Sequence, residues 1–418
     1  MRTTRRTVMR LGVGGALAAT VPCRRAWAAS SAASQAGADA RSHLAKCIYT
    51  RQEVDDWFAG RRYPFAKYDA ELGWLLKNAR FADGVDGSTS TYTYGKYDER
   101  RMIAHADQPC RINTYGDSFT QCHQVNEGET WQEVLARHLH EPIRNFGVGA
   151  YSVYQAYLRM LREEQRVPAK CIIFNIYDDD HYRNLDAWRQ IRSRKDERFI
   201  CPTLPHLKVD LKAGACSKEP NPCPTREEIY HLCDLDWVEK RFRDDFVLNL
   251  MLAHARAREG NPHRAYQSIM DLARTHGINT NVDSMETFSS AANTLHARAA
   301  LLATQQVVEW VEDFARRNDK KVLYVLSFNA LTIARRVREG TRFDRPFVEF
   351  LEERKLPYVD LMQAHLKEFA TFKVGIDDYL KRYYIGHYNP QGNFFAAFAI
   401  KNKLVGMLDP KPSAYLPP

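Results

Sequence analysis

Residues 111–120 read Arg-Ile-Asn-Thr-Tyr-Gly-Asp-Ser-Phe-Thr. The segment 111–115 predicts a short strand, and Gly116 predicts its end. A strand that runs into Gly-Asp-Ser and then into a helix presents the Ser118 hydroxyl at the start of that helix, where backbone N–H groups point outward. This arrangement suits a nucleophile whose attack produces an oxyanion, although Gly-Asp-Ser is also an ordinary turn and helix cap.

The alternation of strand and helix continues along the chain. Strands are expected at 111–115, 143–146, 171–177, 321–327 and 358–361, and helices at 131–139, 154–166, 237–275, 284–316, 346–354 and 393–408. The run 171–177 is largely apolar, as expected of a strand that is buried on both faces. The pattern therefore predicts an α/β fold, a three-layer α/β/α sandwich around a mainly parallel sheet.

The first 28 residues have the composition of an export signal. A basic stretch containing Arg5-Arg6 precedes the apolar run 11–21, and Ala26-Trp27-Ala28 is a small-residue cleavage pattern. The paired arginines resemble a twin-arginine export signal. We therefore expect a bacterial protein that is periplasmic or secreted, with no permanent membrane span because the apolar run is too short for one.

The net charge does not indicate a nucleic-acid partner. Six arginines lie in residues 1–28, and removing that segment lowers the net charge from +9 to +3. The sequence shows no Gly-rich phosphate loop, metal-ligand motif or nucleic-acid module. We therefore expect no cofactor, no metal and no nucleic acid. A hydrophobic fraction of 44% and a charged fraction of 27% exclude a disordered chain.

Export changes how the nine cysteines are interpreted, because the periplasm permits disulfides. Four of them lie close together in the sequence, at Cys201, Cys216, Cys223 and Cys233. We expect at least one disulfide in this group. Free buried thiols are an alternative, and a zinc site is disfavoured because no CxxC pair occurs.

Three further polar segments accompany 116–120. Residues 145–151 and 178–184 each follow a predicted strand, and residues 386–393 open the last predicted helix. Ligands of a parallel sheet bind beyond the carboxyl ends of its strands, so these segments should meet at one edge. His387 lies in a Gly-flanked loop that opens a helix, and it is a candidate general base.

In order and spacing, the four segments resemble the sequence blocks of the SGNH (GDSL-like) hydrolase superfamily, over residues 65–184 and 320–408. The resemblance implies a flavodoxin-like α/β/α fold with Ser118 as nucleophile and His387 as its base. It also implies an oxyanion hole made by the Ser118 N–H, a glycine N–H of the second block and an asparagine side chain of the third. The expected organisation is a signal peptide (1–28), a linker and N-terminal extension (29–62), a hydrolase domain in two parts (63–184 and 301–418) and an insertion (185–300).

The sequence departs from the family pattern at the oxyanion hole. Ala150 stands where the glycine of the second block is expected, which costs little if its backbone angles accept a Cβ. Asp179 stands where the asparagine of the third block is expected. An ionised carboxylate only accepts hydrogen bonds, so it would oppose an oxyanion. Either Asp179 acts while protonated, or it points away, toward Arg183 for example.

A further departure concerns the acid that orients the histidine. Tyr384 occupies the position where the family carries this acid. The nearest upstream carboxylates are Asp377 and Asp378, and either could fold back toward His387. A backbone carbonyl or a distant acid such as Asp360 are the alternatives.

The leading expectation is an exported serine ester hydrolase that acts on O-acyl groups, acetyl groups for example, of a small molecule or a polysaccharide. An O-acyltransferase to polysaccharide and a catalytically impaired sugar-binding protein of the same fold are the alternatives. The insertion is expected to cap the strand ends. Its arginines and aromatic residues suit sugar stacking and anionic groups, namely Trp188, Arg189, Arg192, Tyr230 and Trp237.

Overall fold

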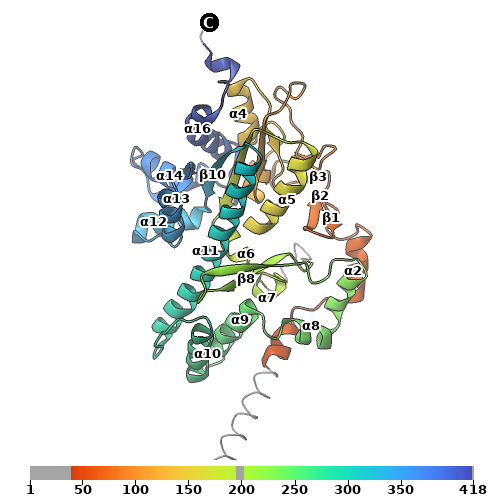
Figure 1. The fold of residues 1–418 in the computed structure, drawn as a ribbon, viewed down its shortest axis with the longest axis vertical. Helices are drawn as coiled ribbons and strands as arrows, with labels where there is room; N and C mark the ends of the chain where they lie inside the picture. Colours follow the sequence, from red (N-terminus) through yellow and green to blue (C-terminus); the bar gives the residue numbers. More distant parts are fainter. Residues whose placement is uncertain (1–38, 194–201, 417–418) are drawn as a thin grey trace, which may run out of the picture.

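The computed structural model describes residues 39–193 and 202–416. A five-stranded sheet lies at its centre, with the strand order β11-β10-β7-β5-β6 and every neighbouring pair parallel (Figure 1). The strands are β5 (Ile112–Tyr115), β6 (Arg144–Asn145), β7 (Cys171–Tyr177), β10 (Lys321–Ser327) and β11 (Tyr358–Asp360). The five strands and the parallel sheet predicted from the sequence are confirmed. Strand β7 is central and almost wholly buried, as its apolar run predicted.

Helices cover both faces of this sheet. The chain moves from β5 to β6 in one direction and then returns across the sheet to β7, β10 and β11. Because crossovers between parallel strands are right-handed, reversing direction places the connecting helices on the opposite face. One layer contains α4 (Trp131–Leu139), α14 (Leu361–Phe369) and α16 (Pro390–Met407), and the other contains α5 (Val153–Arg166), α11 (Met285–Arg317) and α13 (Arg345–Glu353).

The helices begin where side chains can cap them. Thr130 accepts a hydrogen bond from the Glu133 N–H at the start of α4, and Ser152 and Gln155 form a capping box at the start of α5. Asn389 caps α16 by accepting from the Gly392 N–H at 2.9 Å. Such caps satisfy N–H groups that have no partner within the helix. They fix the points at which the polar loops of the sheet edge give way to helices.

Short antiparallel ribbons and small helices surround the sheet. The ribbons are β1 (Ala66–Asp69) with β2 (Gly73–Leu76), β3 (Ala79–Phe81) with β4 (Ser90–Tyr92), and β8 (His206–Asp210) with β9 (Ala215–Glu219). The small helices are α2 (Arg51–Phe58), α3 (Ser118–Gln121), α6 (Asp180–Arg183), α7 (Gln190–Ser193), α12 (Ala330–Glu339) and α15 (Ile376–Lys381). Ribbon β1–β2 packs on the loop after β6, since the Tyr151 hydroxyl donates to the Trp74 carbonyl at 2.5 Å.

The expected insertion is mostly helical. It contains α8 (Leu235–Phe242), α9 (Phe246–Arg258), α10 (Pro262–Thr275) and the first half of α11, which runs from the insertion up to the sheet (Figure 1). Helices α9, α10 and α11 enclose a separate small core that includes Leu250, Ile269 and Phe288. Because α11 is continuous through residue 300, the expected boundary there lies inside a helix. The expected signal peptide lies outside the described residues.

The described cysteines carry no disulfide. Cys216, Cys223 and Cys233 are free thiols, and Cys201 lies outside the described residues. Cys216 is on β9, whereas Cys223 is buried in the loop beyond it and Cys233 ends a short 3-10 helix. The expected bridge is therefore wrong for pairs among these three.

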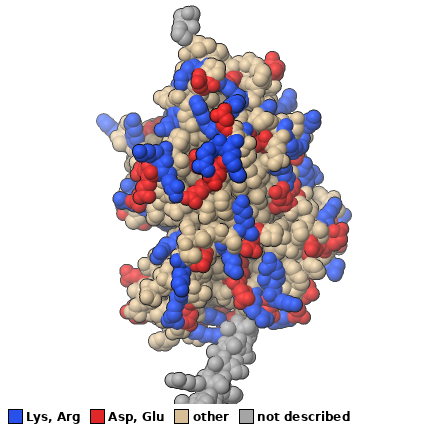
Figure 2. Space-filling model, viewed as in Figure 1, with Lys and Arg blue, Asp and Glu red and all other residues tan. Residues whose placement is uncertain are grey.

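The visible surface carries both signs of charge. Figure 2 shows Lys and Arg side chains interspersed with Asp and Glu over the whole of that face. Within residues 39–193 and 202–416, no helix combines the length and the apolar character needed to cross a bilayer.

Candidate active site

The nucleophile candidate lies where β5 turns into α3. Gly116 has φ of 152°, and a Cβ there would lie 2.2 Å from Thr120 Oγ1, so no residue with a side chain fits. Asp117 caps α3 by accepting from the Phe119 N–H at 2.9 Å. Ser118 is the first residue of α3 and is 8% exposed. The Gly-Asp-Ser turn thus places the hydroxyl at the carboxyl edge of the sheet.

Ser118 and His387 are brought together across 269 positions of sequence. His387 Nε2 lies 2.8 Å from Ser118 Oγ. The His387 backbone N–H donates to Gln124 Oε1 at 2.7 Å, which identifies that atom as the amide oxygen. The same oxygen lies 3.2 Å from His387 Nδ1, so Nδ1 carries the ring proton. The lone pair of Nε2 therefore faces the serine hydroxyl, as a general base requires.

Gln124 is the residue that orients His387, and sequence reasoning missed it. Its backbone has φ of 73°, and its N–H donates to the Tyr92 hydroxyl at 2.6 Å. Its side-chain Nε2 donates to the Asp83 carbonyl at 3.1 Å. The amide is thus held at both ends. No sequence pattern pointed to Gln124, because it lies 263 positions from His387 and carries no charge.

The carboxylates expected to orient His387 form ion pairs elsewhere and do not contact it. Asp377 pairs with Arg338 at 2.5 Å, and Asp378 pairs with Lys381 at 2.9 Å, both on the exposed surface. The expectation for Asp377 and Asp378 is therefore corrected: they lie in the first turn of α15, whose exposed side carries them. The distant alternative, Asp360, pairs with Arg342, while the Tyr384 hydroxyl donates to the Phe328 carbonyl at 3.0 Å.

The surroundings of His387 keep its ring neutral. The ring packs against Phe119 and His123, each with a centroid distance of 5.1 Å. Burial lowers the pKa of the His387 imidazole to about 3, with smaller contributions from His123 and Arg183. His123 itself lies 3.2 Å from Asp83, so a histidine–aspartate pair borders the site. A neutral His387 is the form that can accept the Ser118 proton.

The loop after β6 carries Ala150, whose N–H is the expected oxyanion donor. This loop packs directly on α3, because a Cβ at Gly147 would lie 2.1 Å from the Gln121 backbone nitrogen. A Cβ at Gly149 would lie 3.8 Å from Ser118 Cβ, so the loop borders the nucleophile. The Gly149 N–H donates to Gln121 Oε1 at 2.9 Å. The N–H of Ala150, by contrast, meets no hydrogen-bond acceptor in the part of the chain that the structure describes.

Ala150 has a left-handed backbone, with φ of 66°. For a residue with a Cβ, this conformation costs about 1 kcal/mol. The condition under which alanine would cost little at this position is therefore not met, because its φ is positive. Strain of this kind needs support from the surrounding structure, and it is common at functional sites.

Asp179 does not face Ser118 as an oxyanion donor. Its carboxylate accepts from Arg183 Nε and from Arg192 Nη1, each at 2.8 Å. Burial alone would raise the pKa of this carboxyl, but Arg192 and Arg183 hold it well below its usual value. The placement of Asp179 in the oxyanion hole is thus corrected in favour of the alternative in which it points toward Arg183. The reason is charge: two guanidinium groups stabilise the ionised carboxylate of Asp179, whereas a developing oxyanion would repel it.

Asp179→Asn should therefore lower the expected ester hydrolysis rather than raise it. An amide cannot neutralise Arg183 and Arg192 together, so the segment after β7 should loosen. We expect a lower melting temperature and a kcat toward simple esters at or below the wild-type value from about pH 5 to pH 9. Thermal unfolding and pH–rate profiles of both proteins would check this. A variant that is faster than wild type would return Asp179 to the oxyanion hole.

Arg183 brings a positive charge close to the nucleophile. Its Nη1 lies 3.5 Å from Asp117 Oδ2, and that oxygen lies 3.1 Å from Ser118 Oγ. Arg183 Nη1 also pairs with the buried Asp180 at 2.6 Å. Burial raises the pKa of the Asp117 carboxyl, and the charge of Arg183 opposes that rise. The positive charge of the Arg183 guanidinium thus compensates the negative charge of two buried carboxyl groups at the edge of the site.

The insertion residues expected to contact sugars each contact other side chains of the protein. Trp188 is buried and packs on Tyr49 and Phe242. Arg189 and Arg192 both pair with the buried Asp186. Trp237 stacks on His231, and Tyr230 donates to Asp55 at 2.5 Å. The expectation of a sugar-stacking surface from these residues is therefore corrected for Trp188, because its ring is part of the core.

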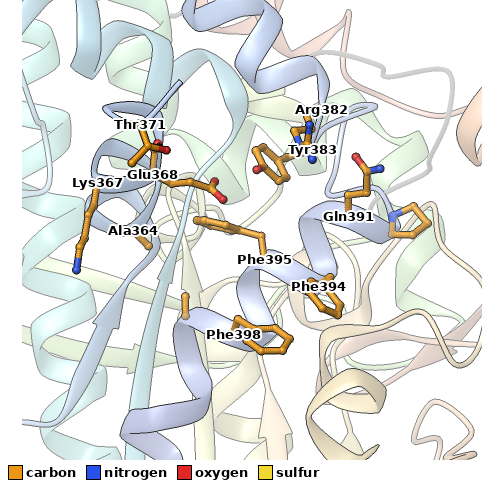
Figure 3. Close-up of a pocket in the computed structure, with 12 residues that line it drawn as sticks. Ala364, Lys367, Glu368, Thr371, Arg382, Tyr383, Gln391, Phe394, Phe395 and Phe398 are labelled. Carbon is orange, nitrogen blue, oxygen red and sulfur yellow. The ribbon is translucent and has the colours of Figure 1, made fainter. Parts of the chain in front are cut away.

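A surface pocket of about 860 Å³ lies between α14 and α16 (Figure 3). It is lined by aromatic and charged side chains, among them Lys367, Glu368, Arg382, Tyr383, Phe394, Phe395 and Phe398. Ser118 and His387 are not among its lining residues. Among the described residues, no group of three or more His, Cys, Asp and Glu side chains is placed to hold a metal ion.

No family model matches the chain, and no curated protein matches its sequence. Among solved structures, similar chains include a lipolytic protein of the G-D-S-L family from Desulfitobacterium hafniense DCB-2, with 11% identity, a TM-score of 0.33 and coverage of 70% of this chain and 98% of that chain. The acetyl xylan esterase AlAXEase has 13% identity and a TM-score of 0.33, covering 71% of this chain and 100% of that chain. LAE5, an alpha/beta hydrolase enzyme from the metagenome of Lake Arreo, has 10% identity and a TM-score of 0.29, covering 71% of this chain and 93% of that chain. These similarities are too distant to assign a function, which has to come from the geometry of the site.

Proposed function

We propose that the protein is a serine ester hydrolase that acts on O-acyl esters. The observation that carries this proposal is the 2.8 Å contact between Ser118 Oγ and the lone pair of His387 Nε2, with Gln124 fixing the ring tautomer. A buried serine hydroxyl at the carboxyl edge of a parallel sheet, held by a neutral histidine, is an activated nucleophile. In place of the acid of a triad, the amide oxygen of Gln124 holds the proton on Nδ1.

The chemistry follows from this geometry. Ser118 Oγ attacks the ester carbonyl carbon while His387 Nε2 takes the serine proton. The tetrahedral intermediate collapses when the bond to the alcohol oxygen breaks and His387 gives that oxygen the proton. Water then attacks the acyl-serine, His387 takes a water proton, and collapse releases the acid and returns the proton to Ser118. The N–H groups of Ser118 and Ala150 stabilise the negative oxygen in both halves.

The pH dependence should set this site apart from one whose histidine has an ordinary pKa. The imidazole is active when neutral, and its pKa is lowered to about 3. Activity should therefore be retained as the pH falls and be lost only as His387 becomes protonated. We expect kcat/KM to be flat from about pH 5 to pH 8, without the usual midpoint near 6.5. Rates measured with a neutral ester, with circular dichroism recorded at each pH to confirm folding, would check this. A sigmoidal rise centred near the ordinary value would contradict it.

The direct test of the proposal is labelling with a fluorophosphonate probe, which reacts with activated serines. Wild type should be labelled, and the labelled peptide should contain Ser118. Ser118→Ala should not be labelled. Wild type that stays unlabelled under conditions in which a control esterase reacts would refute an activated Ser118 and leave the sugar-binding alternative.

The alternative of a non-catalytic protein rested on Tyr384 and Asp179. Both residues have other partners, and Gln124 supplies the missing contact to His387. This geometry favours a catalytic site. An acyltransferase would use the same acyl-serine and pass the acyl group to a sugar hydroxyl. Product analysis in the presence of an oligosaccharide acceptor would separate the two, since a hydrolase releases the free acid.

We further propose that the protein acts outside the cytoplasm. The support is the N-terminal sequence, with Arg5-Arg6, the apolar run 11–21 and the pattern Ala26-Trp27-Ala28. Fractionation of cells that express the full chain would test the location, with Arg5-Arg6 replaced by Lys-Lys as the export-defective control.

A further inference from the structure

Two arginines from the segment after β7 donate hydrogen bonds to the loop that borders Ser118. Arg189 Nη1 donates to the Ala150 carbonyl at 2.6 Å, and Arg183 Nη1 donates to the Tyr151 carbonyl at 3.2 Å. These carbonyls belong to consecutive residues of one loop. Hydrogen bonds from a charged donor are stronger than neutral ones, so together they fix the direction of two successive peptide groups.

The loop that these arginines contact is a tight turn, and one of its central residues has an unfavourable backbone conformation. The Tyr151 N–H donates to the Val148 carbonyl at 3.2 Å, which closes the turn over residues 148–151. Within it, Gly149 is anchored to Gln121, and Ala150 has φ of 66°. Because an alanine disfavours this backbone conformation, contacts from outside the loop must hold it.

The two arginines are themselves held rigidly. The buried carboxylate of Asp186 lies 3.3 Å from Arg189 Nε and 2.8 Å from Arg192 Nη2. Asp179 joins Arg192 to Arg183. The three arginine side chains are 12 to 15% exposed, and Arg189 also lies over the Trp74 ring. The ion pairs thus form a continuous network behind the loop. This network holds the guanidinium groups in position to donate hydrogen bonds to the two loop carbonyls.

We propose that Arg189, with Arg183, is a positioning residue that keeps Ala150 in its left-handed turn, so that the Ala150 N–H stays available to the oxyanion beside Ser118. This inference rests on the proposed function. Arg189 is the residue to test, because Arg183 also contacts Asp117 and Asp180.

A suppressor experiment tests the coupling. Arg189→Met keeps a long side chain but removes the donor to the loop. It should lower kcat by about 10- to 100-fold with little change in KM, since an oxyanion donor acts in the transition state. Ala150→Gly removes the penalty of the left-handed backbone. In the Arg189→Met background it should restore kcat by about 3- to 10-fold.

Arg192→Met is the matched control. Arg192 belongs to the same ion-pair network and has a similar exposure, but its hydrogen bonds go to Asp179 and Asp186 rather than to the loop. Ala150→Gly should raise the melting temperature of both arginine variants but rescue the kcat of Arg189→Met alone. Equal rescue of both would mean general stabilisation and would overturn the inference. Wild-type kcat in Arg189→Met would overturn it as well.

An NMR measurement that does not depend on activity separates the positioning role of Arg189 from the proposed hydrolase function. In protein labelled with ¹³C-alanine, the Cα resonance of Ala150, identified by its loss in Ala150→Gly, reports the left-handed backbone. It should move toward ordinary alanine values in Arg189→Met and stay in place in Arg192→Met. An unchanged resonance in Arg189→Met would overturn the positioning role. Absence of any Ser118-dependent turnover would overturn the proposed function instead.

Discussion

Ser118→Ala and His387→Ala should each lower kcat for ester hydrolysis by about 10⁴- to 10⁶-fold, the largest effect expected in this protein. The two side chains form one proton-transfer unit across 2.8 Å, so loss of either member disables the unit. Steady-state rates with a p-nitrophenyl ester, measured on proteins of equal circular dichroism, would check the expectation.

The double variant adds a test of the coupling between the two residues. Residues that act as a unit are strongly non-additive, so Ser118→Ala with His387→Ala should be little slower than either single variant. Additive losses would indicate two independent roles. Near-wild-type turnover by Ser118→Ala would place the nucleophile elsewhere.

Gln124→Ala should lower kcat by about 10²- to 10⁴-fold, the second largest effect. Without the amide oxygen, nothing selects the tautomer in which His387 Nδ1 carries the proton, and the ring is free to turn away from Ser118. The His387 backbone N–H loses the same acceptor. Activity within about 3-fold of wild type would show that another group orients the ring.

Matched variants sharpen this test. Asp377→Asn and Asp378→Asn remove the two carboxylates predicted from the sequence, and they should leave kcat unchanged because both pair with surface cations. Gln124→Glu should behave in the opposite way to the alanine variant. A carboxylate at this position stabilises the imidazolium and raises the pKa of His387, so the acid limb of the pH–rate profile should move to higher pH.

The strands and the two proposed catalytic residues were predictable from the sequence, because the patterns that define them are local. The apolar run 171–177 favours a strand buried on both faces, and Gly116 ends β5 with a backbone that residues with a side chain rarely adopt. Ser118 and His387 each lie in a short segment with its own turn and helix cap. The chemistry of these segments is therefore visible without knowledge of what packs against them.

The partners of the reactive residues were decided by tertiary structure alone. Gln124 meets His387 across 263 positions, and an uncharged amide gives no signal in a sequence. Asp179 occupies the position expected of an oxyanion donor, but Arg183 and Arg192 bind its carboxylate and turn it away from Ser118. The left-handed backbone of Ala150 contradicts the local preference of alanine and depends on contacts from Arg189. Local preference thus determined where the chain forms strands, turns and caps, whereas hydrogen-bond partners and charge pairs depend on which distant segments the fold brings within about 3 Å of each other.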